Sequence, residues 1–150
     1  MIVFLDFDGV THPVSGSTPF RPDCLEALSC ATSELNTHIV ITSSWRLEYN
    51  LDELKLLLGD ELGSRVIDVT PELDQDPFLH WPRAREVLKW LIQNRMHDKP
   101  WVAIDDEEGN YPAGYSYITD RQTGFTNRDI PLLLEHAKQS IESKPLIDVL

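Results

Sequence analysis

Short apolar runs alternate with helical patterns along this chain. Residues 2–5 form a wholly apolar run, as in a strand buried on both faces of a sheet, and further short strands are expected at residues 38–41, 65–69, 101–104 and 115–119. Between and after them lie stretches with helical apolar spacing or helix-end residues, at residues 22–35, 45–58, 83–96 and 130–141. The second of these stretches is expected to be irregular near Tyr49 and Asn50 and to stop at Gly59. Strands that alternate with helices predict an α/β fold with a mainly parallel, five-stranded sheet.

The clearest amphipathic helix is expected over residues 83–96. Its apolar side chains recur on one helix face and are expected to pack on the sheet: Val87, Leu88, Leu91 and Ile92. Trp90 and Trp101 are expected in the core because they lie in this helix and in the strand that follows. Trp81, in a His-Trp-Pro sequence, is the one tryptophan that we keep as a candidate substrate contact.

The composition is that of a folded protein with an unusually acidic surface. With 150 residues, 41% hydrophobic and 25% charged, we expect residues 1–150 to form one domain with a real core. The net charge of −12 argues against a broad nucleic-acid-binding surface and against docking on an anionic membrane. A local basic pocket is still compatible with this charge.

The cysteines and the N-terminus indicate a cytoplasmic protein. Cys24 and Cys30 have no zinc-site spacing and are expected to be buried, reduced thiols. Asp6 and Asp8 interrupt the first apolar run, so we expect no signal peptide. We also expect no membrane span, because no run approaches the roughly 18 apolar residues that a spanning helix needs.

Polar residues follow three of the predicted strands at the point where each strand ends. They are Asp6 with Asp8, the hydroxyl residues 42–44, and the pair 105–106. Ligands of parallel α/β sheets bind outside the carboxyl ends of the strands, so these three groups predict a common site. Gly9 would permit a sharp turn and a close approach of ligand to the backbone.

These residue types are suited to a metal and a phosphate. Carboxylates at about 4 Å repel one another by roughly 4 kcal/mol at an effective dielectric near 20, which favours a cation between them. Carboxylate, phosphate and water oxygens are the ligands of Mg²⁺. The hydroxyls of Thr42, Ser43 and Ser44 precede a predicted helix, where they either hold a phosphate oxygen, cap the helix, or do both.

The order of these motifs resembles the haloacid dehalogenase (HAD) phosphohydrolase superfamily. The matching segments are MIVFLDFDGV, IVITSSW, the region of Arg83 and Arg85, and WVAIDDEE. More narrowly, FLDFDGVTHP, TSSWR, RxxEVxxWL and TDRQTGFT resemble the small HAD domains of Swiss Army Knife RNA-repair proteins. The resemblance implies a three-layer, HAD-like Rossmannoid fold. The segment from Trp45 to Arg83 is too short for a separate cap domain, so an open site is expected.

The resemblance also implies roles for the strand-end residues. Asp6 would be the nucleophile that forms an aspartyl-phosphate, and Asp8 would act as general acid and base. Ser43 would bind the phosphoryl oxygens, with Thr42 as the alternative, and Ser44 and Gly9 would contribute to substrate binding. The implied ligands of Mg²⁺ are Asp6, Asp8, Asp105 and Asp106.

The third HAD motif departs from its usual lysine. The start of the helix offers Arg83 and Arg85, whereas Lys89 lies farther along it. An arginine fork suits phosphate, and we favour Arg83 for this role, with Arg85 as a further substrate-binding candidate. For Arg46 we expect a surface position, and for His12 a structural role.

These features lead to a specific functional hypothesis. It is a Mg²⁺-dependent phosphomonoester hydrolase with an open site, whose substrate is a small molecule, a phosphorylated nucleic-acid end or a protein. The alternative is a non-hydrolytic phosphate-binding or protein-interaction module of the same fold. A response-regulator receiver fits poorly, since it expects its phospho-accepting Asp on the third strand, whereas here an acidic pair ends the fourth.

Overall fold

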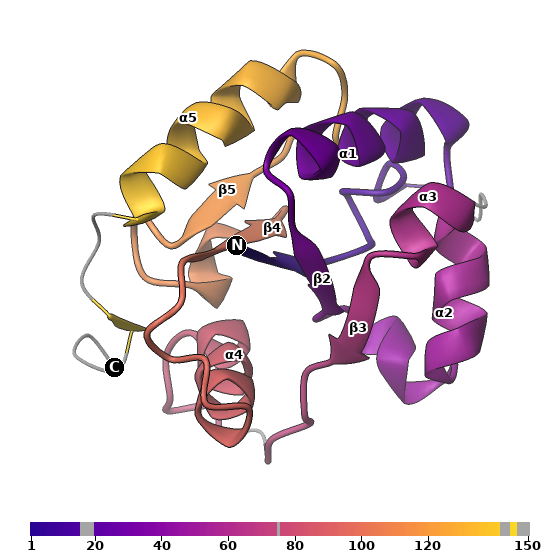
Figure 1. Cartoon of the computed structure of the whole chain (residues 1–150). Helices are drawn as coiled ribbons and strands as arrows, with labels where there is room; N and C mark the ends of the chain where they lie inside the picture. The colour runs from indigo at the N-terminus through magenta and orange to yellow at the C-terminus, as the bar shows by residue number, and fades with distance from the viewer. Residues whose placement is uncertain (16–19, 75, 142–144, 147–150) are drawn as a thin grey trace.

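A computed structural model describes residues 1–15, 20–74, 76–141 and 145–146 of the chain. Its strands form one wholly parallel sheet of five strands in the order β3-β2-β1-β4-β5 (Figure 1). The strands are β1 (Ile2–Leu5), β2 (His38–Ile41), β3 (Val66–Val69), β4 (Trp101–Asp105) and β5 (Ser116–Ile118). The main helices are α1 (Pro22–Glu34), α2 (Leu51–Leu58), α3 (Asp60–Gly63), α4 (Pro82–Gln93) and α5 (Asp129–Ile141).

The sheet is covered on both faces, which makes the three predicted layers. Alternate side chains of a strand point to opposite faces, so β1 sends Val3 and Leu5 into one core and Ile2 and Phe4 into the other. The first core packs under α1 and α5, and the second packs under α4 on the opposite face (Figure 1). An apolar run without alternation is therefore the sequence pattern of a strand buried on both sides.

The strand order places the candidate site beside the first strand. The chain runs outward from β1 to β2 and β3, then returns to the other side of β1 as β4. Leu5 is in register with Ile41 on β2 and with Ile104 on β4. Asp6, Thr42 and Asp105 follow these three residues, so they emerge at one level of one sheet edge. The point where strand order reverses is also where open α/β sheets bind ligands.

Residues 44–64 form a 3-10 turn and two helices, where the sequence predicts one irregular helical stretch over residues 45–58. A 3-10 turn, η1 (Ser44–Leu47), precedes α2, and the break lies near Tyr49 and Asn50 as expected. Asn50 begins α2 with a capping box: its side chain accepts from the Glu53 N–H and Glu53 accepts from the Asn50 N–H. Gly59 ends α2 as predicted, but the short α3 that follows was not predicted.

Outside the site, the predicted burial is wrong for Ile92 and Cys30 and is confirmed for the other side chains described in this paragraph. Trp90 and Trp101 are buried, as expected. Ile92, however, is 48% exposed, because α4 turns Ala84, Val87 and Leu91 toward the sheet instead. Cys24 is buried, but Cys30 on the same helix is exposed. In the described part of the chain, no helix is both long enough and apolar enough to cross a membrane.

Candidate active site

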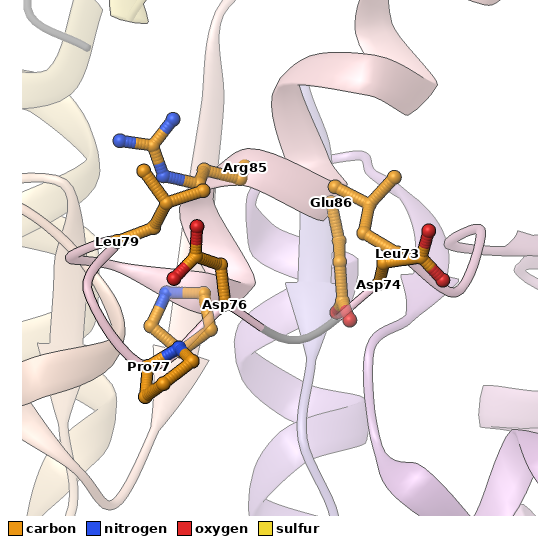
Figure 2. Close-up of a pocket in the computed structure, with 8 residues that line it drawn as sticks. Leu73, Asp74, Asp76, Pro77, Leu79, Arg85 and Glu86 are labelled. Atoms are coloured by element: carbon orange, nitrogen blue, oxygen red, sulfur yellow. The ribbon is translucent and has the colours of Figure 1, made fainter.

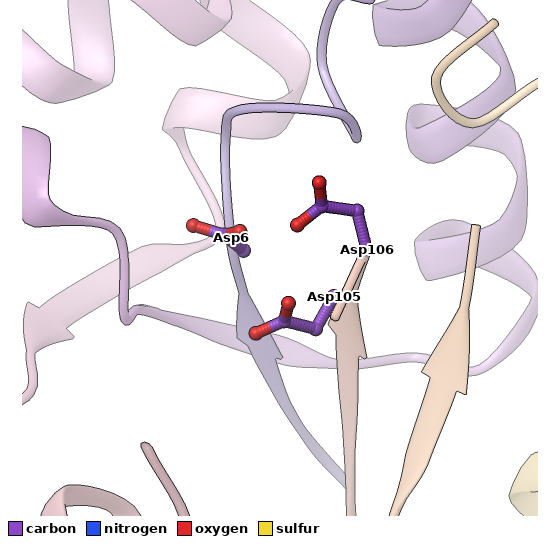
Figure 3. Close-up of side chains that lie close together, drawn as sticks. All are labelled: Asp6, Asp105 and Asp106. Carbon is purple, nitrogen blue, oxygen red and sulfur yellow. The ribbon is translucent and has the colours of Figure 1, made fainter. Parts of the chain in front are cut away.

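Three aspartates come together where β1 and β4 end. Each of Asp6, Asp105 and Asp106 offers a carboxylate oxygen, and these oxygens all lie within 4.8 Å of one another (Figure 3). Asp6 directly follows β1, whereas Asp105 ends β4 and Asp106 follows it. The Asp6 N–H donates to the Ile104 carbonyl at 3.0 Å, which ties the end of β1 to the end of β4. The convergence predicted from two distant acidic pairs is thus present for these three residues.

The cluster is electrostatically costly for a metal-free protein. Burial raises the pKa of Asp6 well above its ordinary value, and the Asp105 charge raises it further, against a backbone hydrogen bond and the Arg83 charge. Burial also raises the pKa of Asp105 to about 6, despite hydrogen bonds from the Glu107 N–H and Asn110. Asn110 donates to both Asp105 oxygens at 3.2 Å, so this carboxylate is held in one orientation.

The donor set fits a hard divalent cation. Carboxylate oxygens are the hard ligands that Mg²⁺ prefers, and the ion would relieve the repulsion among these three side chains. In the described structure, the positive group that contacts Asp106 is the half-exposed Arg121, whose Nη2 lies 3.2 Å from Oδ2. Arg121 belongs to the TDRQTGFT segment. It therefore lies at the edge of the cluster, paired with the candidate metal ligand Asp106.

The Asp8 carboxylate lies outside the three-aspartate cluster and has its own partners. Trp45 Nε1 donates to Asp8 Oδ1 at 3.2 Å, and His12 Nε2 lies 3.0 Å from the same oxygen. About half of the Asp8 side chain is exposed, so the carboxylate is accessible to a substrate. The sequence hypothesis counted Asp8 among the metal ligands, but the structure brings its side chain to an aromatic residue and a histidine instead.

Gly9 is required by the close approach of two site loops. Its φ of +74° lies in the left-handed region, and a Cβ built there would be 2.5 Å from Asp106 Oδ2. The buried Thr119 hydroxyl donates to the Gly9 carbonyl at 2.7 Å, which fixes this turn. The position therefore lets the loop after β1 pass directly over Asp106.

Gly9→Ala is expected to lower the free energy of unfolding by roughly 1–3 kcal/mol, because the new Cβ is strained in φ and displaces Asp106. Urea denaturation followed by circular dichroism measures the change. Gly109→Ala is the matched control, since no atom lies within 4 Å of a Cβ built there. Equal stabilities of the two variants would contradict this account of Gly9.

The three hydroxyl residues have different surroundings. The Ser43 hydroxyl accepts from the Trp45 N–H at 3.3 Å, so it caps the 3-10 turn. The Thr42 hydroxyl is buried and has no hydrogen-bond partner among the described residues, whereas Ser44 is exposed. Of the three, Thr42 is thus the residue whose buried hydroxyl is left without a protein partner among the described residues.

Tyr111 is a site residue that sequence reasoning missed. It is only 3% exposed, yet its hydroxyl has no hydrogen-bond partner among the described residues. Burial and the charges of Asp105 and Asp6 raise the pKa of Tyr111. The hydroxyl also neighbours that of Thr42, although their geometry does not form a hydrogen bond. Two unpartnered buried hydroxyls beside the aspartates would suit an oxygen-rich ligand.

The two candidate arginines of the third motif separate in space. Arg83 is half-buried near Asp6, and its Nη1 lies 3.0 Å from Glu86 Oε2. Arg85 Nε instead donates to the His80 carbonyl at 2.8 Å. Figure 2 shows the Arg85 guanidinium and the Glu86 carboxylate pointing in different directions. Arg83 is thus the one of the two arginines whose charge acts on Asp6, whereas Arg85 borders a separate cavity.

Arg46 is buried, so the expected surface position is wrong. Its side chain is 2% exposed, and its Nη2 lies 3.1 Å from Glu86 Oε1. Arg46 also donates to the carbonyls of Thr42, Ser43 and Thr70 at 2.9–3.0 Å. These contacts show why a cation can be buried here: each of its guanidinium nitrogens has an oxygen partner.

Comparisons with known proteins agree with this architecture. The crystal structure of D,D-heptose 1,7-bisphosphate phosphatase from B. bronchiseptica, complexed with magnesium and phosphate, is similar in fold, with a TM-score of 0.54. The two chains share 16% identity, over 88% of this chain and 86% of that one. No curated protein sequence matches significantly.

The described residues share the fold of that phosphatase, a parallel sheet between helical layers, and they include no separate cap domain. A family model described as the HAD domain in Swiss Army Knife RNA repair proteins matches residues 2–130. The chain belongs to this family. Both the superfamily and the narrower resemblance inferred from the sequence motifs are thereby confirmed.

Proposed function

We propose that this protein is a Mg²⁺-dependent phosphomonoester hydrolase that forms a phosphoenzyme on Asp6. The observation that carries the proposal is the meeting of Asp6, Asp105 and Asp106 within 4.8 Å at the sheet edge where α/β proteins bind ligands. These three carboxylates are the residues that would hold the ion. Bound Mg²⁺ would offset the negative charge of the substrate phosphate.

Asp6 and Asp8 would share the chemistry in two steps. An Asp6 oxygen attacks phosphorus while the bond to the leaving oxygen breaks, and Asp8 gives that oxygen its proton. In the second step, Asp8 takes a proton from water, whose oxygen attacks the same phosphorus and releases inorganic phosphate and the free Asp6 carboxylate. Trp45 and His12 hold the Asp8 carboxylate beside the site, which supports this division of roles.

Arg83 and the hydroxyl of Thr42 would bind the phosphoryl oxygens. Arg83 lies close enough to Asp6 for its charge to lower the pKa of that carboxyl, so it can also neutralise a phosphoryl group on Asp6. Ser43 would support this loop as a cap, and Ser44 and Gly9 would line the entrance. The open site suits a large substrate such as a phosphorylated nucleic-acid end.

Arg83→Ala is expected to lower kcat/KM by about 10²-fold, because it removes a preorganised cation beside the reacting group. Arg85→Ala is the matched control from the same helix, and it is expected to change kcat/KM by less than about 3-fold, since its guanidinium binds the His80 carbonyl. Steady-state phosphate release measures both variants. A larger loss for Arg85→Ala than for Arg83→Ala would reverse the assignment of the two arginines.

A phosphate-release screen tests the proposed function directly. Purified protein is assayed with and without Mg²⁺ on nucleotides, on 3′- and 5′-phosphorylated oligonucleotides, on sugar phosphates and on phosphopeptides. We expect turnover that needs Mg²⁺. Binding of inorganic phosphate and Mg²⁺ without turnover on any substrate would instead support the non-hydrolytic module of the same fold.

A further inference from the structure

We propose that Glu86 is a positioning residue that sets the orientation of Arg83 toward Asp6 and fastens it to the strand ends through Arg46. This inference rests on the proposed function, because it assigns Glu86 a part in presenting Arg83 to the phosphoryl group. Glu86 is the glutamate of the RxxEVxxWL segment, and neither the metal cluster nor the proposed proton transfers use it.

The Glu86 carboxylate is placed between two guanidinium groups. It is buried, and its two oxygens are divided between the arginines: Oε1 lies 3.1 Å from Arg46 Nη2, and Oε2 lies 3.0 Å from Arg83 Nη1. Arg83 stands one helical turn before Glu86, so α4 itself presents the pair on one face. The contact uses only one Arg83 nitrogen, which leaves the rest of its planar fork available to phosphoryl oxygens.

Arg46 makes the other end of this arrangement rigid. Its Nη1 donates to the carbonyls of Thr42 and Ser43, just after β2, and its Nε donates to the Thr70 carbonyl, just after β3. Arg46 therefore cannot move toward the phosphate without breaking buried hydrogen bonds. Because Glu86 pairs with both arginines, it holds Arg83 at a fixed position relative to Arg46. The arginine on α4 is thereby also fixed relative to the loop that carries the Thr42 hydroxyl.

Charge balance explains why the central group is an acid. Arg46 and Arg83 are near enough for the Arg83 charge to contribute to lowering the pKa of Arg46, after burial as the main cause. Glu86 acts against this effect on Arg46. At Arg83, burial lowers the pKa, but the charge and hydrogen bond of Glu86, together with nearby charges such as that of Asp6, raise it above its ordinary value. Without a negative charge between them, the two guanidiniums would repel each other, and the more exposed Arg83 would move outward.

The cavity beside α4 offers Glu86 no alternative cation. This cavity of about 310 Å³ is bordered by Glu86, Asp74, Asp76 and Arg85 together with apolar side chains (Figure 2). Arg85 is its basic residue, and the Arg85 guanidinium is bound to the His80 carbonyl. In the described residues, the ion pairs of Glu86 are thus those with Arg46 and Arg83.

A double-mutant cycle tests whether Glu86 acts through Arg83. The variants are Glu86→Gln, Arg83→Ala and their combination, assayed for kcat, KM and thermal unfolding. We expect Glu86→Gln to lower kcat/KM by about 10-fold or more in the wild-type background and by less than about 2-fold in the Arg83→Ala background. The same factor in both backgrounds would show that Glu86 acts independently of Arg83 and would overturn the proposal.

Further measurements separate positioning from general stability and from the proposed function. Glu135→Gln, on the distant α5, removes an equal charge from an exposed side chain and is expected to leave kcat/KM unchanged. If Glu86→Gln does not fold, Glu86→Asp replaces it in the cycle, with a loss again expected only when Arg83 is present. If the wild type shows no turnover, the proposed function fails. The cycle is then repeated with calorimetric binding of inorganic phosphate in Mg²⁺, where additive losses again overturn the role of Glu86.

Discussion

Asp6→Asn is expected to abolish phosphate release, with a fall in kcat of at least about 10³-fold. The amide keeps the shape of the carboxylate, and it loses the negative oxygen that would attack phosphorus. The substituted residue would stand in the same place, directly after β1, with its N–H bonded to the Ile104 carbonyl. A phosphate-release assay on the best substrate of the screen measures the loss, and mass spectrometry detects any phosphoenzyme.

The same variant is expected to unfold at a higher temperature than the wild type in EDTA at pH 7.5. Burial and the Asp105 charge raise the pKa of Asp6, so its ionised form costs stability there, and a neutral amide removes that cost. Each kcal/mol gained raises Tm by about 2–4 °C in a protein of this size. Activity that survives in a folded Asp6→Asn protein would remove Asp6 as the nucleophile. A lower Tm would contradict the electrostatic account of the cluster.

The parts of the fold that could be predicted from sequence are those that depend on local pattern. Residues 2–5 and 101–104 are apolar because both faces of their strands are buried, and each run is followed by an aspartate at the same sheet edge. Hence the sheet, its parallel sense and the meeting of Asp6 with Asp105 follow from chain order and periodicity. Gly59 likewise ends α2, because glycine is a common helix C-cap and can be recognised from the sequence alone.

The parts that could not be predicted depend on tertiary contacts. Nothing adjacent to Arg46 in the sequence shows that it is buried, because Glu86, its charge partner, lies 40 positions away (86 − 46). The sequence indicates only that Tyr111 lies in a loop beside a proline, yet its hydroxyl is buried near Asp6 and Asp105. The alternation that places Asp6 in the cluster does not fix the direction of Asp8, which is set by Trp45 and His12. Such positions follow from packing between elements, which periodicity does not encode.

Mg²⁺ is expected to offset the pH dependence of stability that Asp105 causes. Burial raises the pKa of Asp105 to about 6 from 3.8, so the folded protein holds its proton more tightly than the unfolded chain. In EDTA, unfolding free energy should therefore fall as the pH rises from about 4 to 6 and stay low above it. The expected loss is about 3 kcal/mol, at 1.36 kcal/mol for each pKa unit.

Saturating Mg²⁺ should restore stability where Asp105 is ionised and have little effect at pH 4.5, where it is protonated. At 100 times its dissociation constant, the ion adds about 2.7 kcal/mol at pH 7.5. Thermal unfolding between pH 4.5 and 8, in EDTA and in Mg²⁺, measures both effects. Asp105→Asn should flatten the metal-free curve and weaken the response to Mg²⁺, whereas Asp98→Asn, at an exposed position outside the site, should do neither. An unchanged Tm of the wild type in Mg²⁺ at pH 7.5 would mean that the three carboxylates do not form the cation site, because relief of their repulsion is what should make binding visible as stability.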